Sequence, residues 1–274
     1  MTASKQVIKI AILAMGGEGG GVLADWLVDV ARHADHPAQA TSIPGVAQRT
    51  GATTYYIEIF PQPRSALGGK QPVLGLNPLP GRLDALVSSE LLETARQISN
   101  GLTSAEHSCV ITSSSRILTT LEKMSMGDGR KDDAALRTLV STHSKTHHIL
   151  DMARITQEAG TVVSAVMFGC IAASGLLPFA RADYEAVIGS TGKAAQASLR
   201  GFGMAYEAIQ AQRQQQSFIE AVMTPPQSAA HAVPDIVAQT FPAPLHAMVS
   251  LGYARVLEYQ SQAYAQTYLS RLSS

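Results

Sequence analysis

The chain opens with an apolar run, a glycine-rich stretch and a periodic segment, a pattern that predicts the start of an α/β fold. The β-branched run at 7–13 predicts a central parallel strand. Apolar positions recur at helical spacing over 22–34, and the inner face of this helix is expected to carry Val22, Trp26, Leu27 and Val30. A short second strand is expected over 38–42. This order predicts a βαβ unit whose two strands pair in parallel through a right-handed crossover.

Strand and helix patterns continue to alternate as far as residue 215. Polar and apolar residues alternate over 52–60, as in a half-exposed strand. Further strands are expected over 83–88, 109–112 and 149–152. Helices are expected over 89–98, 116–124, 161–174, 181–188 and 193–215. Together these elements predict an α/β, Rossmann-like fold with a mostly parallel sheet flanked by helices.

Two proline-rich segments interrupt this pattern. The first, 61–80, holds five prolines and is expected to be a long irregular excursion. Such excursions are more often functional sites or interfaces than inert loops. The second is predicted to be a linker over 223–235, between a domain at 1–222 and a helical extension at 236–274. Because one helix cannot bury itself, the periodic tail at 246–272 either docks on the first domain or begins a helical module.

Composition narrows the classes of partner. Lys and Arg together number 21, as do Asp and Glu, so no global field attracts nucleic acid or an anionic membrane. Only 15% of residues are charged, against roughly 25% in an average soluble domain. With a hydrophobic fraction of 46%, this favours a surface that is partly covered by partner subunits.

Two segments imitate membrane signals, and both are explained better by a cytoplasmic globular protein. The apolar run at 7–15 is interrupted by Lys9 and has no small-residue cleavage site after it. The uncharged segment 159–180 is split by glycine and proline, which leaves a piece too short for a bilayer and predicts a buried helix. Cys109 and Cys170 lie in apolar stretches and are expected to be buried and reduced.

The glycine loop at 14–21 is the first candidate for chemistry. Its backbone N–H groups and the following helix dipole could hold an anion, and glycine permits both the tight turn and a close approach. A dinucleotide fingerprint would require G-x-G-x-x-G and a ribose-binding acid after the second strand, and both are missing. Glu18 adds a negative charge where a phosphate would lie. NAD binding is therefore disfavoured, and the loop serves either packing or another ligand.

A second candidate follows the second strand, in the loop that carries Gln48, Arg49 and Thr50. This loop is expected to face the same sheet edge as the glycine loop. The planar guanidinium of Arg49 suits a carboxylate or a phosphate. An ordinary pairing of Arg49 with a neighbouring acid or carbonyl is an equally good explanation.

The remaining polar clusters favour structural roles. His143 and His147 could meet on one helical face, but the H-E-x-x-H pattern is absent and Lys145 repels a cation, so a metal site is disfavoured. Asp25 and Asp29 are predicted to lie on the solvent face of the first helix.

Two further polar stretches are also predicted to be structural. The serines at 113–115 are expected to cap a helix. The charged stretch 127–133 is expected to be a solvated turn.

Together, the glycine loop and the loop that carries Arg49 resemble the gamma-type domain of 2-oxoacid:ferredoxin oxidoreductases. That family has a G-x-G-G-Q-G loop, which aligns with 14–19 so that Ala14 replaces the first glycine and Glu18 the glutamine. Its R-G-G or R-T-G turn corresponds to 49–51. The stretches 122–129, 151–154 and 174–179 are similar to the long bacterial form of the indolepyruvate oxidoreductase beta subunit.

The resemblance covers roughly 7–215, and it implies a subunit role. The implied reaction is oxidative decarboxylation of indolepyruvate or another arylpyruvate to an acyl-CoA, with electrons passed to ferredoxin. Thiamine diphosphate, Mg and the iron–sulfur clusters would lie on a large partner subunit, with none bound by this chain alone. The residues implied for the CoA region or the partner interface are Gly16, Gly17, Gly19, Gly20, Gly21, Gln48, Arg49 and Thr50. The alternatives are a stand-alone NAD- or nucleotide-binding Rossmann-like protein and a non-enzymatic scaffold that keeps the fold.

Overall fold

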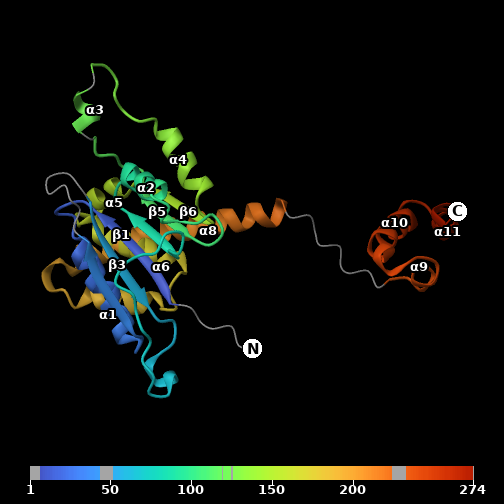
Figure 1. The fold of residues 1–274 in the computed structure, drawn as a ribbon, viewed down its shortest axis with the longest axis horizontal. Helices are drawn as coiled ribbons and strands as arrows, with labels where there is room; N and C mark the ends of the chain where they lie inside the picture. The colour runs from blue at the N-terminus through green and yellow to red at the C-terminus, as the bar shows by residue number, and fades with distance from the viewer. Residues whose placement is uncertain (1–6, 44–51, 119, 125, 224–232, 274) are drawn as a thin grey trace. The chain divides into compact units, whose positions relative to one another are not determined.

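The structure is a computed structural model that describes residues 7–43, 52–118, 120–124, 126–223 and 233–273. The chain folds into two compact units, Met1–Gln214 and Gln215–Ser274. The first unit holds the sheet and its covering helices, and the second is helical (Figure 1).

A six-stranded sheet forms the centre of the first unit. Its strands are β1 (Ile8–Ala14), β2 (Ala38–Ile43), β3 (Thr53–Ile59), β4 (Ala85–Ser88), β5 (Cys109–Ser113) and β6 (Thr146–Leu150). They lie in the order β2-β3-β1-β4-β5-β6. The pairings β1–β4, β4–β5 and β5–β6 are parallel, whereas β3 is antiparallel to both of its neighbours. The predicted α/β class is confirmed, with three parallel pairings and two antiparallel ones.

The predicted pairing of the first two strands is wrong. β1 and β2 run in the same direction, but β3 lies between them and bonds to both. The buried residues Tyr56, Ile57 and Ile59 give β3 the character of an interior strand, so it takes the place beside β1. β2 is left at the sheet edge, where its residues are half-buried or exposed.

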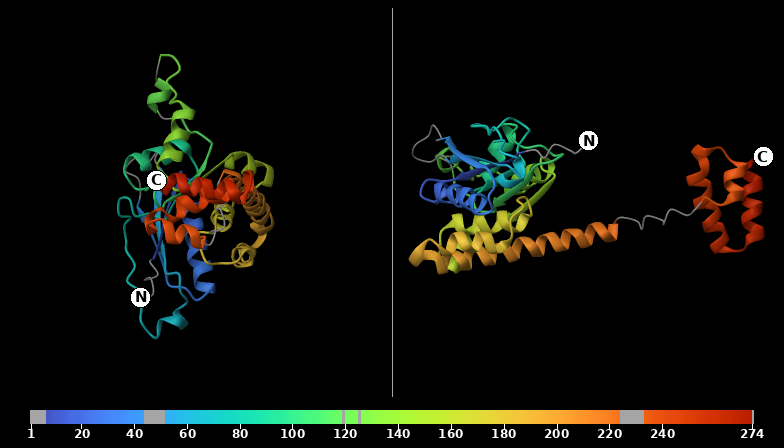
Figure 2. Two further views of the ribbon diagram at one scale, coloured as in Figure 1. Left: turned by 90° about the vertical axis from the view of Figure 1, so that its right-hand side faces the viewer. Right: turned by 90° about the horizontal axis from the view of Figure 1, so that it is seen from below.

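Helices cover both faces of the sheet. One face carries α1 (Gly20–His33), α5 (Met152–Ala159), α6 (Val163–Ser174), α7 (Arg181–Gly189) and α8 (Ala195–Met223), which share one large hydrophobic cluster with the sheet. The views in Figure 2 place α1 and α6 together on this side. The other face carries α2 (Leu91–Ser99) and α4 (Asp133–Thr142), which lie over β4, β5 and β6. The result is a three-layer α/β/α unit.

The uncharged segment forms the buried helix that its composition predicts. Nine of the twelve residues of α6 are buried, and Phe168 packs against Trp26, Tyr184 and Phe202. A Cβ on Gly169 would meet the backbone of Phe202, so glycine permits the close approach of α6 and α8. Within the described ranges no single helix is long and apolar enough to cross a membrane; α5 and α6, bent by 116°, pass that test only as a pair.

Several local predictions need correction. Val22 is 47% exposed, and Leu23 takes the inward position on α1. The helix expected over 116–124 is reduced to α3 (Thr120–Met124), because Arg116 and Ile117 are held in an extended loop by Glu90. α4 was not predicted at all. The segment 61–80 is irregular as expected, apart from the short turn η1 (Arg64–Leu67).

The second unit contains α9 (Asp235–Thr240), η3 (Ala243–Leu245), α10 (His246–Tyr259) and α11 (Gln262–Ser273). Val237, Val249 and Leu269 form its small core, and Phe241, Tyr253 and Tyr268 pack around them. The periodic tail is thus two helices with a break after Tyr259. Most of the predicted linker, 224–232, lies outside the described residues.

Candidate functional site

The topology of the sheet has a reversal point at the carboxyl ends of the parallel strands β1 and β4. β1 and β4 are parallel neighbours, but the chain leaves β1 for α1 on one face and β4 for α2 on the other. Such a reversal is where open α/β sheets bind their ligands. The glycine loop follows β1 at this point, and Ser89 and Glu90 follow β4.

Glycine is required at different positions of the loop for different structural reasons. Gly17 and Gly19 have φ values of 89° and 77°, in the left-handed region that favours glycine. Gly19 is also the N-cap of α1, and a Cβ there would lie 2.9 Å from Ser164 Oγ. A Cβ on Gly20 would lie 2.5 Å from the Tyr55 ring, so α1 packs closely on β3. Gly16 has open space around it and Gly21 only ordinary contacts with Tyr55, so neither has these constraints.

The Glu18 carboxylate forms hydrogen bonds at the loop rather than projecting away from it. Its Oε2 accepts a hydrogen bond from the Met15 backbone N–H at 2.7 Å and another from the Ser89 hydroxyl. The Ser89 N–H bonds in turn to Leu13 O at 3.1 Å. The carboxylate therefore links the β1 connection to the β4 connection at the reversal point. It occupies a backbone donor and places a negative charge where an anionic ligand would need positive potential.

Ser164 lies behind the loop in the first turn of α6. It is 1% exposed, and its Oγ has no hydrogen-bond partner among the described residues. This hydroxyl faces the Cα of Gly19 and sets the space available there. No sequence pattern indicates this contact, because Ser164 is 145 positions from Gly19 and sits in an apolar helix.

Glu90 and Arg116 extend the polar network along the same sheet edge. The Glu90 carboxylate caps α2 through the Glu93 N–H at 2.6 Å, and it accepts from the Ile117 N–H at 3.1 Å. Arg116, whose side chain is 10% exposed, pairs with Glu90, Glu122 and Asp133. The guanidinium therefore joins the β4 connection to the excursion that follows β5.

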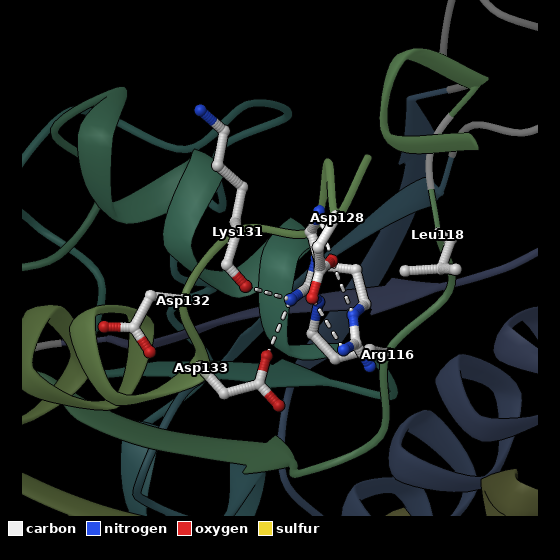
Figure 3. A pocket seen from close by; sticks show the side chains of 7 residues that line it. Arg116, Leu118, Asp128, Lys131, Asp132 and Asp133 are labelled. Carbon is white, nitrogen blue, oxygen red and sulfur yellow. Dashed lines mark hydrogen bonds and ion pairs between the residues drawn. The ribbon is translucent and has the colours of Figure 1, made fainter. Parts of the chain in front are cut away.

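Arg116 also organises the stretch that was expected to be only a solvated turn. It donates to Lys131 O at 2.9 Å and to Asp133 Oδ1 at 2.6 Å, and these contacts form one wall of an open pocket of about 670 Å³ (Figure 3). Asp128 and Arg130 are exposed, as expected for a turn, and pair with each other at 2.8 Å. The stretch is thus anchored at one end by an ion pair between the largely buried Arg116 and the exposed Asp133, which its sequence does not reveal.

Two further groups of residues were candidates from the sequence. Gln48, Arg49 and Thr50 lie in 44–51, outside the described residues. His147 belongs to β6 while His143 caps α4, so the expected i, i+4 helical pair does not form. No group of three potential metal-ligating side chains occurs in the described ranges.

Two predictions about polar side chains have different outcomes. The hydroxyl of Ser113 accepts from the Ser115 N–H at 3.1 Å in a turn, rather than capping a helix as expected. Asp25 is exposed, and Asp29 pairs with Arg32 at 2.9 Å. The predicted solvent face of α1 is confirmed.

Both thiols are protonated at neutral pH. Burial raises the pKa of Cys170 to about 12 and also raises that of Cys109, which is half-buried. At Cys109 burial outweighs the nearby positive charge of Arg213, so neither thiol has the lowered pKa of a reactive cysteine.

Comparison with known proteins identifies the family. The profile described as "Pyruvate ferredoxin/flavodoxin oxidoreductase" matches residues 9–208, so the chain belongs to that family. No curated protein sequence matches the chain. A 2-oxoglutarate:ferredoxin oxidoreductase from Magnetococcus marinus, solved with 2-oxoglutarate, coenzyme A and succinyl-CoA bound, is similar in structure, with a TM-score of 0.53 and 13% identity. The match covers 76% of this chain but 32% of that one, which establishes likeness of fold.

Two shorter solved chains are similar at a lower level. Pyruvate oxidoreductase subunit PORC from Thermotoga maritima has 17% identity and a TM-score of 0.49, with 74% of this chain and 97% of that chain covered. The gamma subunit of keto/oxoacid ferredoxin oxidoreductase from Geobacter sulfurreducens PCA has 15% identity and a TM-score of 0.49, with 74% and 99% covered.

Proposed function

We propose that this chain is the gamma-type subunit of a 2-oxoacid:ferredoxin oxidoreductase and that it assembles with a larger, cofactor-bearing subunit. The observation that carries the proposal is the family match over 9–208, which includes the whole sheet from Lys9 onward and the glycine loop. The similar fold in the Magnetococcus marinus enzyme occupies about a third of a longer chain. This supports a role for the fold as one part of a larger assembly.

The redox cofactors are assigned to the partner. An iron–sulfur cluster held by cysteine requires four thiolates, and this sequence has Cys109 and Cys170 alone. These two thiols lie in β5 and α6, and burial keeps both protonated. The partner would therefore hold the clusters together with thiamine diphosphate and Mg, and ferredoxin would take electrons from the partner.

The proposed substrate is indolepyruvate or a related arylpyruvate, which is oxidatively decarboxylated to an acyl-CoA. This assignment rests on the resemblance of 122–129, 151–154 and 174–179 to the long indolepyruvate-type subunit. Part of the first stretch is anchored by Arg116, through its pairing with Glu122.

The glycine loop is proposed to face the CoA region or the partner subunit, together with Gln48, Arg49 and Thr50. Of these two roles, Glu18 favours contact with the partner. Its carboxylate already accepts from Met15 N–H and Ser89, and it would repel a CoA phosphate brought to the same donors. The phosphates of CoA are therefore expected to contact residues other than the 15–18 turn.

Dinucleotide binding has no comparable support. The acid that would bind a ribose belongs at the end of a second strand adjacent to the first. Here β3 separates β1 from β2, and β2 ends in Thr41, Ser42 and Ile43.

Reconstitution with the larger subunit tests the proposal. We expect the isolated chain to be colourless and inactive, and the complex to reduce ferredoxin when indolepyruvate and CoA are both present. Replacing both cysteines by serine should leave the visible absorption of the complex unchanged. Loss of that absorption would place a cluster ligand on this chain, and a preference for pyruvate or 2-oxoglutarate would remove the arylpyruvate assignment.

A further inference from the structure

The proline-rich segment 61–82, here called the strap, covers a part of the sheet that helices leave open. On the face of α2 and α4, those helices contact β4, β5 and β6. Tyr56 and Glu58 of β3 point to the same face, and the β2 residues opposite them in register are Thr41 and Gln39. The strap hydrogen-bonds to three of these side chains, those of Glu58, Thr41 and Gln39. It therefore takes the position that a helix would occupy in a uniformly covered sheet.

Hydrogen bonds from the sheet hold the strap in place, and one of them ends on the buried Glu58. The Gly75 N–H donates to the Glu58 carboxylate at 2.5 Å, and Glu58, which is 5% exposed, also accepts from Tyr56 Oη at 2.5 Å. The Thr41 hydroxyl donates to Leu76 O at 2.7 Å, and Gln39 Nε2 donates to Gly75 O at 3.1 Å. The backbone around Gly75 is thus held to the sheet by the side chains of Glu58, Thr41 and Gln39.

The two ends of the strap are fixed as well. Arg64 N–H donates to Asp35 O at 2.7 Å, and Gly81 N–H donates to Gly101 O at 2.7 Å. A proline-rich segment held at its ends and its middle has little conformational entropy left to lose when another surface binds it.

The fixed strap presents apolar side chains to solvent. Val73 is 94% exposed, and Leu76 and Leu79 are each 63% exposed. These three large apolar residues lie within seven positions of one another and are mostly exposed to water. Exposure of so much apolar surface is energetically unfavourable. The hydrogen bonds to Gly75 and Leu76 prevent the segment from turning these side chains inward.

The charges of the strap have a single sign. Arg64, Lys70 and Arg82 are exposed, and the sequence from 61 to 82 contains no Asp or Glu. A second copy of this chain is a poor occupant, because a twofold contact would bring the cations of the two straps together. A surface that fits must offer an apolar centre with carboxylates at its border.

We propose that the strap is a docking surface for the larger subunit, which meets it with an apolar patch bordered by Asp and Glu. This inference rests on the proposed function, since it names the segment through which the subunit assembles. Val73, Leu76 and Leu79 supply the buried centre of the contact, and the three cations steer the encounter.

The test measures binding of the full chain to the purified larger subunit, by surface-immobilised kinetics at several salt concentrations. Leu76→Asp/Leu79→Asp should weaken the affinity about 100-fold, as expected for the loss of central apolar contacts. Arg64→Glu/Lys70→Glu should lower the association rate about 10-fold and remove its decrease with added salt. Thermal unfolding of each variant alone should match the parent, because all four side chains are exposed or peripheral to the core.

Met126→Asp is the control, since Met126 is fully exposed on a different excursion and the change replaces an apolar side chain by a carboxylate, as each leucine substitution in the strap does. Its affinity should equal that of the parent. Parent-like binding by Leu76→Asp/Leu79→Asp, or equal weakening by Met126→Asp, would overturn the strap as the docking surface while leaving the proposed function intact. Self-association of the parent that these strap variants abolish would make a second copy the occupant and would also overturn it. Failure of the parent itself to bind would count against the proposed function.

Discussion

Substitution of Gly19 tests the reasoning about the glycine loop most sharply, because two separate costs meet at one residue. Gly19 has φ 77° and ψ 28°, a left-handed conformation that costs a non-glycine residue roughly 1–2 kcal/mol. A Cβ there would also lie 2.9 Å from Ser164 Oγ and 3.4 Å from Ser164 Cβ. Overpacking of a closed site of this kind costs about 1–3 kcal/mol. The two together predict that Gly19→Ala loses about 2–5 kcal/mol, and Gly19→Val loses more because its branched Cβ adds atoms.

Two other glycines of the same loop separate these costs. Gly17 has φ 89° but open space around it, so Gly17→Ala should lose only the conformational part, about 1–2 kcal/mol. Gly16 has neither a positive φ nor a close neighbour, so Gly16→Ala should be neutral or stabilising by up to about 1 kcal/mol. Asp25→Asn, on the solvent face of α1, should have almost no effect.

The variant Ser164→Ala isolates the steric part of the stability cost of Gly19→Ala. Alone it should be nearly neutral, because the Ser164 hydroxyl has no partner among the described residues. Combined with Gly19→Ala, it should recover about 1–2 kcal/mol of the loss as a coupling energy. Thermal unfolding is a suitable assay, since about 1 kcal/mol corresponds to roughly 2–4 °C in a domain of this size. Equal losses for Gly17→Ala and Gly19→Ala, with no recovery in the double variant, would refute the packing argument.

Three further predictions concern charged residues. Glu18→Gln should leave thermal stability within about 1 kcal/mol of the parent, because the amide oxygen can still accept from Met15 N–H, and it should strengthen CoA binding in calorimetry only if phosphates approach the loop. Arg116→Met should cost about 3 kcal/mol in denaturant unfolding, because it leaves Glu122 buried without this cation, and a change below about 1 kcal/mol would contradict a buried ion pair. Arg49→Ala should change stability little yet lower the activity of the reconstituted complex, whereas unchanged activity would make Arg49 an ordinary surface residue.

Local sequence patterns predict most of the elements but not their order in space. The β-branched run at 7–13 and the uncharged helix at 161–174 gave correct elements, because burial on both faces leaves a continuous apolar signal. The insertion of β3 between β1 and β2 was missed because strand pairing depends on long-range contacts. α4 was missed because its inward residues, Leu136, Leu139 and Val140, stand among polar ones beside a charged turn.

The polar contacts of the site were the least predictable part. The glycine loop and its constraint at Gly19 follow from the strand–glycine–helix pattern. The partners that define its chemistry do not, because Ser89 lies 71 positions from Glu18 and meets it only once the sheet has formed. The same holds for Arg116, whose contacts with Glu90 and Asp133 join the connection after β4 to the connection after β5.

One measurement addresses the subunit role directly: the rate of ferredoxin reduction by the larger subunit, with indolepyruvate and CoA, as this chain is titrated in. We predict that the rate rises with added chain and saturates at a fixed stoichiometric ratio, while the chain alone gives no reduction. A full rate from the larger subunit without this chain, or ferredoxin reduction by this chain alone, would contradict that role.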